Sequence, residues 1–282
     1  MARFQINQPS DLVRHYRHRA KKQFGQHFIV DPGILDNLIA EAGVSAGDRV
    51  LEIGPGCGTL TWRLLEHGAE VVAVEVDRQA VEFLEEIVQF DEGFRLIEGD
   101  VLETDVAELL GEGEESWRCV ANLPYNVATE ILFHLAPHFD RFCCLVLMFQ
   151  REVAHRIVAE VGEDDYGRLS LMSRLYADVE VVQKLAPGAF QPPPRVHSAA
   201  VRFDPIEGTR IPDGETRRRF ERLVAVAFQA RRKIAPNALA RISDSKEEIE
   251  ATLEALGIDR MRRPEQIAFD QWVSLAERLE VF

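Results

Sequence analysis

The chain carries the sequence Asn122-Leu123-Pro124-Tyr125 directly after an apolar run that begins at Trp117. The Asn122 side-chain oxygen and the Leu123 carbonyl can each accept a hydrogen bond, and Pro124 stiffens the turn that presents them. The Tyr125 ring adds a surface on which a planar base can stack. These groups are suited to holding the exocyclic amino group of a nucleobase. The sequence shows no Ser-His-Asp arrangement or metal-ligand set that would offer a competing chemistry.

A glycine-rich turn, Glu52-Ile53-Gly54-Pro55-Gly56-Cys57-Gly58, lies between the first predicted strand and the first predicted helix. It has no lysine for a G-x-x-x-x-G-K-[ST] loop, and Thr59 stands where a dinucleotide-binding G-x-G-x-x-G motif needs its last glycine. Glu75 ends the next predicted strand, where a carboxylate can bind both hydroxyls of a ribose. Asp100, after the third strand, can accept a hydrogen bond from an adenine amino group.

Carboxylates around a nucleoside without phosphates suit S-adenosylmethionine, whose sulfonium is cationic, better than a pyrophosphate cofactor. Each carboxylate taken singly could be a helix cap, and a glycine-rich turn alone is weak evidence. Together with the two acceptors at Asn122 and Leu123, they predict the transfer of a methyl group to a nucleobase amine. A dehydrogenase is not favoured, because Thr59 breaks its motif and the sequence shows no acid or base for hydride transfer.

Adenine N6 is a poor nucleophile, because its lone pair is delocalised into the ring. The site must therefore increase the nucleophilicity of this nitrogen. Two acceptors at Asn122 and Leu123 would draw this nitrogen toward tetrahedral geometry and align its lone pair for in-line displacement. A strong general base is not needed, because the nitrogen becomes acidic only after it gains the methyl group.

Apolar runs alternate with segments of helical periodicity from about residue 49 to 160, which predicts βα units on a mostly parallel sheet. Strands are predicted at 49–54, 70–75, 94–98, 117–122 and 142–149, and helices at 59–66, 77–89, 128–136, 150–159 and 167–177. Two β-rich runs, 179–185 and 197–203, are joined by a proline-dense connection that suits an antiparallel hairpin at the sheet edge.

After a Pro- and Gly-containing linker at 204–213, every segment is predicted to be helical: 215–229, 236–242, 246–256 and 264–279. The fold class is therefore α/β, a doubly wound, Rossmann-like domain over residues 1–206, followed by a small all-helical domain over 207–282. A chain of 282 residues, 46% of them hydrophobic, is long enough for one large and one small core.

The net charge of −14 argues at first against a nucleic-acid partner. The cations are nevertheless concentrated: residues 1–25 hold six, which include Lys21 and Lys22, against one acid, and residues 217–241 hold eight, which include Arg231, Arg232 and Lys233, against one acid. A solvated charge run is the simpler interpretation of either cluster. Two such clusters flanking a base-binding motif favour contact with RNA phosphates.

Four cysteines show no C-x-x-C pair, and three of them lie in apolar or glycine-rich runs. We therefore expect reduced thiols and a cytoplasmic location, with no structural metal. The sequence has no apolar run long enough to cross a membrane and no apolar segment after its basic N-terminus, so neither a membrane span nor a signal peptide is expected.

The motifs, taken in order, resemble those of the KsgA/Dim-type small-subunit ribosomal RNA adenine dimethyltransferases. Besides the glycine-rich turn and the Asn122 motif, the resemblance rests on Lys22-Gln23-Phe24-Gly25-Gln26-His27-Phe28, Gln150-Arg151-Glu152-Val153, Tyr166-Gly167-Arg168-Leu169-Ser170, Ala189-Phe190-Gln191-Pro192-Pro193-Pro194-Arg195-Val196-His197-Ser198 and Phe228-Gln229-Ala230-Arg231-Arg232-Lys233. It extends from about residue 20 to the end of the chain. Two departures are His27, where an Asn is common in the family, and Ile234-Ala235-Pro236-Asn237 after the basic motif.

The resemblance implies which residues serve the reaction. Cofactor contacts fall on His27, Ile29, Gly54, Gly56, Glu75, Asp100 and Asn122. The target adenine would be sandwiched between Tyr125 and Phe190, although Phe190 could instead be a core aromatic residue. The implied activity is dimethylation of the N6 amines of two adjacent adenosines in a hairpin near the 3′ end of small-subunit rRNA, with S-adenosylmethionine as cofactor, the immature small ribosomal subunit as partner, and a monomeric enzyme.

Two other functions remain open from the sequence. A large-subunit rRNA adenine methyltransferase of the Erm type shares the superfamily, but residues 166–170 and the basic motif at 231–233 argue against it. A non-catalytic ribosome-assembly or transcription factor on the same fold is the other alternative. The intact Gly54, Glu75, Asp100 and Asn122 argue against a loss of catalysis.

Overall fold

The computed structural model describes residues 6–17, 27–87, 92–113, 116–242 and 245–279. The chain divides into two compact units, one made of Met1–Ala154 and Glu180–Pro205, the other of His155–Val179 and Ile206–Phe282. The domain boundary predicted near residue 206 coincides with the point between Pro205 and Ile206 where the chain passes from the first unit to the second. The segment 155–179, which we assigned to the first domain, is grouped with the C-terminal helices instead.

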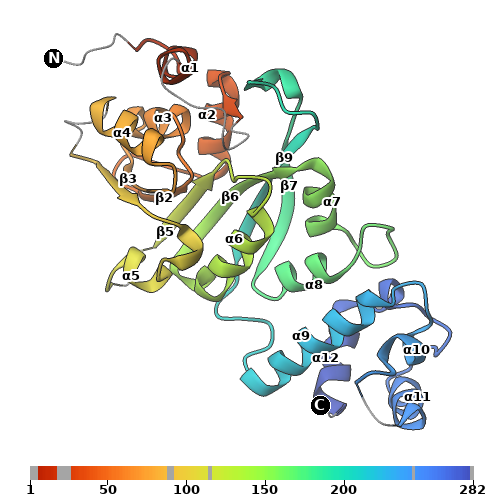
Figure 1. The fold of residues 1–282 in the computed structure, drawn as a ribbon. Helices are drawn as coiled ribbons and strands as arrows, with labels where there is room; N and C mark the ends of the chain where they lie inside the picture. The colour runs from red at the N-terminus through yellow and green to blue at the C-terminus, as the bar shows by residue number, and fades with distance from the viewer. Residues whose placement is uncertain (1–5, 18–26, 88–91, 114–115, 243–244, 280–282) are drawn as a thin grey trace. The chain divides into compact units, whose positions relative to one another are not determined.

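The first unit is built on a seven-stranded sheet with the order β4-β3-β2-β5-β6-β9-β7 (Figure 1). Its parallel strands are β2 (Arg49–Ile53), β3 (Glu70–Glu75), β4 (Phe94–Glu98), β5 (Trp117–Ala121) and β6 (Phe142–Gln150). β9 (Ser198–Pro205) runs antiparallel to β6, and β7 (Ala177–Leu185) lies at the edge. The predicted α/β fold with a mostly parallel sheet is confirmed.

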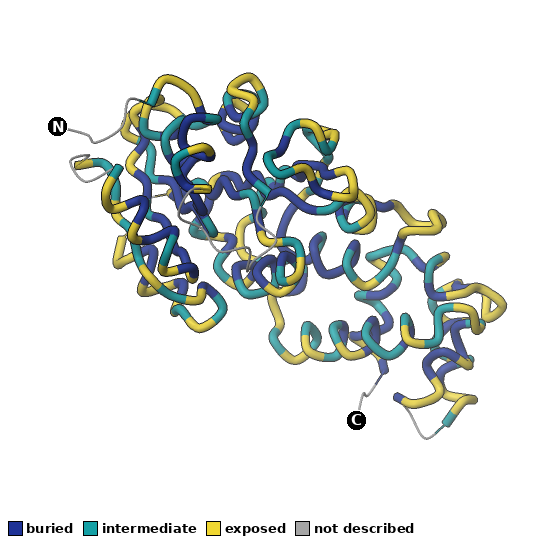
Figure 2. Tube along the Cα trace, turned by 45° about the horizontal axis from the view of Figure 1, so that its top comes forward, coloured by how far each residue is buried: buried dark blue, intermediate teal, exposed yellow. Residues whose placement is uncertain are grey.

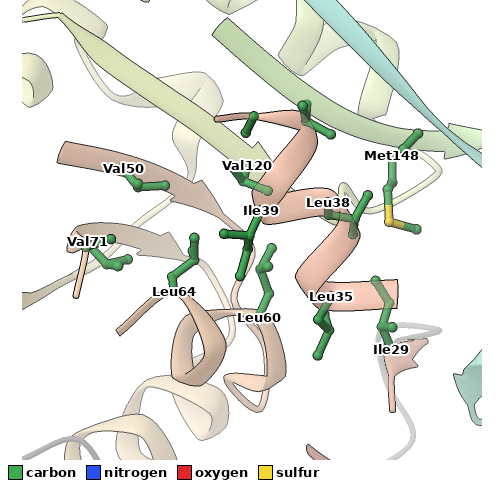
Figure 3. Close-up of a cluster of buried hydrophobic side chains, with 14 of the residues drawn as sticks. Ile29, Leu35, Leu38, Ile39, Val50, Leu60, Leu64, Val71, Val120 and Met148 are labelled. Carbon is green, nitrogen blue, oxygen red and sulfur yellow. The ribbon is translucent and has the colours of Figure 1, made fainter. Parts of the chain in front are cut away.

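One face of this sheet is covered by α2 (Pro32–Glu41) and α3 (Thr59–Glu66). Figure 3 shows Leu35, Leu38 and Ile39 of α2 in one cluster with Leu60 and Leu64 of α3 and with side chains of the strands. The central strands are buried almost throughout, and every second residue of each strand points to this face. The strand residues in this cluster include Val50, Val71, Val120 and Met148.

The opposite face carries α6 (Ala128–Leu135) and the 3-10 segment Ala136–Arg141 (Figure 1). Phe139 of that segment packs edge-on against Phe203 of β9, at 5.8 Å between ring centroids, and Phe149 of β6 reaches the same ring at 6.3 Å. The remaining helices of the βα units are α4 (Arg78–Ile87), α5 (Val106–Leu110) and α7 (Arg151–Val158).

Three N-terminal elements, α1, β1 and α2, were not predicted from the sequence. The helix α1 (Pro9–Arg17) buries Leu12, Val13 and Tyr16 in a small core with Phe28 and Phe83. A separate two-stranded sheet joins β1 (Phe28–Ile29) to β8 (Phe190–Gln191). Strands of two residues leave almost no periodic signal in a sequence.

The second unit contains α8 (Arg168–Arg174), α9 (Gly214–Gln229), α10 (Ala235–Leu239), α11 (Lys246–Ala255) and α12 (Phe269–Arg278). Phe228 of α9 contacts both Tyr166 and Trp272, at 6.5 and 6.1 Å between ring centroids, and the Tyr166 hydroxyl donates to the Ile267 carbonyl at 3.2 Å. These contacts explain why 155–179 belongs to this unit. Figure 2 shows both buried and exposed positions along the helical part of the chain.

The single helix predicted over 264–279 was wrong. The chain forms a 3-10 turn at Pro264–Gln266 and begins α12 only at Phe269, where the Gln271 side chain accepts from the Ala268 amide at 3.1 Å. Among the described residues, no helix combines the length and apolar character that a membrane crossing would need.

Candidate active site

A cavity of about 830 Å³ lies at the carboxyl ends of the parallel strands. Its walls come from the turn after β2, the end of β3, the segment after β4 and the loop after β5. The strand order reverses between β2 and β5, and ligands of open α/β sheets bind at such a switch point. Ten of the predicted site residues line this one cavity: His27, Ile29, Gly54, Gly56, Glu75, Asp100, Asn122, Leu123, Pro124 and Tyr125.

On its cavity side, the glycine-rich turn depends on glycine at two positions. Gly54 and Gly56 adopt φ values of 66° and 58°, which side chains rarely tolerate. A Cβ on Gly56 would also lie 2.5 Å from a ring carbon of Phe28. Glycine is therefore required here both by the φ values and, at Gly56, by the close contact with the Phe28 ring.

Glu75 is buried at the end of β3 and ties two loops together. Its Oε2 accepts from the Gly56 amide at 2.9 Å, and its Oε1 accepts from the Asp77 amide at 2.8 Å. Burial raises the pKa of this carboxyl, while the two backbone donors act in the opposite direction. Each carboxylate oxygen can accept a second hydrogen bond, so Glu75 keeps the capacity to bind ligand hydroxyls.

Glu52 is a second buried carboxyl in the cavity wall, and the sequence motifs did not predict a role for it. It is 2% exposed and accepts a hydrogen bond from the Thr61 hydroxyl at 2.7 Å. Burial, reinforced by the nearby Glu75, raises its pKa to about 8. Its position at the head of the glycine-rich turn is the signal that could have identified it.

The segments after β3 and β4 offer an apolar surface beside an acceptor. Val76, which follows Glu75, is 59% exposed although it is apolar, and it lines the cavity together with Val101. Asp100 accepts from the Leu102 amide through Oδ1 at 2.9 Å, and this bond leaves Oδ2 available. An exposed valine next to such an acceptor suits a planar heterocycle with an amino group.

Asn122 is held in one orientation by a distant carbonyl. Its Nδ2 donates to the His27 carbonyl at 2.8 Å. A carbonyl can only accept, so this bond fixes the nitrogen end of the amide and leaves Oδ1 as the free end. Within the described part of the chain, neither Asn122 Oδ1 nor the Leu123 carbonyl accepts a hydrogen bond. Both acceptors are therefore unoccupied by donors of the described residues.

Tyr125 is anchored at its hydroxyl and covered on one side. The hydroxyl is 2.5 Å from Ser198 Oγ, and the His27 ring stacks on Tyr125 with 6.2 Å between centroids and 27° between planes. His27 is itself fixed, because its Nδ1 donates to the Pro192 carbonyl at 2.8 Å. Burial raises the pKa of the Tyr125 hydroxyl, so it stays protonated at neutral pH.

Phe190 is not at the cavity. It is 3% exposed, pairs with Ile29 through β8 and β1, and packs in the main core beneath α2. The predicted sandwich of Tyr125 and Phe190 is therefore not the arrangement in this structure, because the apolar ring is taken up by the core. The aromatic neighbour of Tyr125 is His27. Lys21 and Lys22 lie outside the described residues.

The basic motif after α9 divides into two kinds of residue. Arg231 is half-buried, lies 3.8 Å from a carboxylate oxygen of Glu265 and donates to the Glu163 carbonyl at 3.5 Å. Arg232 and Lys233 are exposed. The Ala235 amide donates to the Arg262 carbonyl at 2.7 Å, which brings the exposed cations at 260, 262 and 263 into the same unit beside them.

These features define a class of protein. A Rossmann-like sheet, a glycine-rich turn without a phosphate-binding lysine, carboxylates after two neighbouring strands and two acceptors at Asn122 and Leu123 are the features expected of a nucleoside-dependent methyltransferase. The residues fit S-adenosylmethionine, since Glu75 and Asp100 offer acceptors in a cavity that Gly54 and Gly56 also line.

A family model of ribosomal RNA adenine dimethylases matches residues 17–280. The chain belongs to this family, which confirms the resemblance drawn from the motifs and the prediction that the chain is an enzyme.

Individual relatives cover nearly the whole chain. The ribosomal RNA small subunit methyltransferase A of Pseudomonas putida is 41% identical over 94% of this chain and 96% of its own length. The protein of the same name from Clostridium acetobutylicum is 37% identical over 95% of this chain and 96% of that one.

Solved structures show the same architecture. A dimethyladenosine transferase from Plasmodium falciparum superposes with a TM-score of 0.73 at 27% identity, covering 88% of this chain and 96% of that one. The 23S rRNA methyltransferase ErmE has a TM-score of 0.68 at 23% identity, covering 89% and 99%, a likeness of fold alone.

Proposed function

We propose that this enzyme uses S-adenosylmethionine to dimethylate the N6 amines of two adjacent adenosines in a hairpin near the 3′ end of small-subunit rRNA, within the immature subunit. One observation carries the proposal. Asn122 is locked by the His27 carbonyl so that its Oδ1, together with the Leu123 carbonyl, presents two free acceptors in the cavity. An amino group with two N–H donors is the complementary ligand.

The cofactor would lie along the carboxyl ends of β2, β3 and β4. In this proposal Glu75 binds the ribose hydroxyls, Asp100 accepts from the adenine amino group, and Val76 packs on the adenine ring. When bound, S-adenosylmethionine supplies an activated methyl group. Gly54 and Gly56 line the cavity beside it, and Glu52 contributes a carboxyl to the same wall.

The protein's part in the reaction is to orient the amine. Oδ1 of Asn122 and the carbonyl of Leu123 accept its two N–H bonds and turn the nitrogen lone pair toward the cofactor. Tyr125 stacks on the base, with its ring held by Ser198. A monomethylated amine still has one N–H to donate, so one acceptor remains engaged in the second round.

The rRNA would be gripped through phosphates by exposed cations that include Arg232 and Lys233, while Arg231 supports the loop that carries them. A base must leave its stack to enter such a cavity, and the stacking surface of Tyr125 offsets part of that cost. We also propose a cytoplasmic, monomeric enzyme, since the substrate is the maturing subunit.

Replacing Asn122 tests the central observation. We expect Asn122→Ala to keep the fold and cofactor affinity but to lower the methylation rate by about 10²–10³, the usual loss for one preorganised polar group. Asn126→Ala is a matched control, because Asn126 is an exposed asparagine of the same loop. If Asn122→Ala stayed within threefold of the wild-type rate, the two-acceptor arrangement would not be the source of catalysis.

The substrate is tested separately. Purified enzyme is incubated with labelled S-adenosylmethionine and with immature small subunits or large subunits, and the modified bases are then mapped. Label on two adjacent adenosines of the small subunit is expected. Label on the large subunit would favour the Erm-type alternative, and no label on either RNA would favour a non-catalytic assembly role.

A further inference from the structure

The N-terminal helix α1 fixes one wall of the cavity through its inner face. Tyr16 is 1% exposed, and its hydroxyl donates to Asp77 Oδ2 at 2.9 Å. Asp77 lines the cavity, and Phe28, which packs edge-on against Tyr16 at 5.6 Å, closes over Gly56. The helix is therefore held firmly in place, and its outer face has a defined position relative to the reaction centre.

The outer face of α1 borders a hollow of about 490 Å³. Among the described residues, its walls are Ser10, Arg14 and Arg17 of α1 and Gln191 of β8. All four side chains carry hydrogen-bond donors, and two carry permanent positive charge. Planar guanidinium groups with several fixed donors are suited to phosphate oxygens.

The two arginines differ in how their side chains are held. Arg14 is held by Asp11 at 2.6 Å, yet 62% of its side chain is exposed. Asp11 is almost buried, and its Oδ2 is used by the backbone amides of Asn7 and Gln8, so it orients Arg14 and does not fill the hollow. Arg17 is exposed and makes no ion pair within the described ranges.

The hollow lies close to the place where the target base would sit. Gln191 is paired with Phe28 across the β1–β8 ribbon, and Phe28 follows His27, whose ring stacks on Tyr125. With about 3.8 Å between successive Cα atoms and about 5 Å between paired strands, the Cα atoms of Gln191 and His27 are within about 10 Å. This separation is on the scale of one or two nucleotides.

We propose that Ser10, Arg14, Arg17 and Gln191 bind a phosphodiester of the RNA strand immediately flanking the target adenosine. Enzymes that extract a base commonly contact the neighbouring nucleotides, because the backbone must be held while the base turns out. An RNA strand is the favoured occupant, since the hollow stands beside a base-binding cavity. The proposal rests on the proposed function and adds a location and a contact to it.

The test removes the two charges and compares the result with an equal loss elsewhere. Arg14→Ala/Arg17→Ala is compared with Arg78→Ala/Arg95→Ala, two exposed arginines on the same unit that lie outside the hollow. RNA affinity is measured over a range of salt concentrations. The first variant should flatten the slope of log affinity against log salt by about 1.4–1.8, as expected for two lost phosphate contacts, and the control should flatten it by less than about 0.5.

A second measurement locates the contact. Single neutral methylphosphonate linkages are introduced on either side of the target adenosines in a synthetic RNA hairpin. In the wild type, one linkage next to the target should weaken binding, and in Arg14→Ala/Arg17→Ala the same linkage should have no further effect. Both variants should bind S-adenosylmethionine with unchanged affinity, which shows that the first unit is folded.

The outcomes separate this inference from the function on which it rests. If the wild type neither bound nor methylated RNA, the proposed function would fail. If the wild type did both and the two double variants behaved alike, the phosphate site at α1 would be refuted while the proposed function stood. Sensitivity only to linkages far from the target would also overturn the assignment.

Discussion

Replacing Glu52 by Gln should make the protein's stability less dependent on pH. Glu52 is buried in the cavity wall, and burial together with Glu75 raises its pKa from 4.5 to about 8. Glutamine has nearly the same shape, and its side-chain oxygen can still accept from Thr61. The substitution therefore removes the titration with little loss of packing.

The direction in which stability changes with pH follows from the protons that Glu52 binds in the folded and unfolded states. In the unfolded chain Glu52 loses its proton near pH 4.5, whereas in the folded protein it keeps the proton up to about pH 8. The contribution to stability is therefore fully present below the unfolded pKa and is lost as pH rises through the folded value. Between pH 6 and 8 the wild type should lose about 2 kcal/mol of unfolding free energy that Glu52→Gln retains, at 1.36 kcal/mol for each unit of pKa difference.

Urea titrations followed by tryptophan fluorescence at pH 6, 7 and 8 measure this difference. The range stays above the isoelectric point of about 5.1, near which proteins are least soluble. Glu130→Gln, an exposed residue of α6, is the matched control and should run parallel to the wild type. If the stability difference between Glu52→Gln and wild type were the same at all three pH values, the assigned burial of a protonated carboxyl would be refuted.

Three further substitutions test the cavity and the basic surface. Glu75→Gln should weaken S-adenosylmethionine binding by about 1.5–3 kcal/mol in calorimetry, the scale of a hydrogen bond to a charged group; unchanged affinity would make Glu75 a purely structural tie between loops. Tyr125→Ala should lower kcat/KM for rRNA by roughly 5–150-fold through lost base stacking, whereas Tyr125→Phe keeps the ring and should retain most activity; equal effects would exclude stacking. Arg232→Ala/Lys233→Ala should flatten the salt dependence of RNA binding by up to about 1.4–1.8, while Arg231→Ala should mainly lower Tm; the reverse pattern would invert the roles assigned to them.

The fold class and the location of the site were determined by local sequence signals. The alternation of apolar strands with helical segments fixed the positions of β2 to β6 within one or two residues, because both periodicities are local properties. Glu75, Asp100 and Asn122 each follow a different parallel strand. The carboxyl ends of such strands meet at one edge of a sheet, so their convergence could be expected without coordinates.

The detailed state of the site depended on contacts between distant parts of the chain. The carbonyl that orients Asn122 is 95 residues away, and the one that fixes His27 is 165 residues away. The motif that contains Phe190 indicated an aromatic ring at the base, but pairing of β8 with β1 places that ring in the core. Such pairings leave no local pattern in the sequence, because they depend on which distant segments the tertiary fold brings into contact.

The pKa of Glu52 and the environment of the basic motif also depend on the tertiary structure. The sequence identified the basic motif at 231–233 and placed Glu52 in the glycine-rich turn without assigning it a role. Only burial gives Glu52 its raised pKa, and only the contact with Glu265 separates Arg231 from its exposed neighbours. The sequence specifies the type of each side chain. Its solvation and its partners are set when the whole chain has folded around it, since both depend on the distance to groups that are remote along the chain.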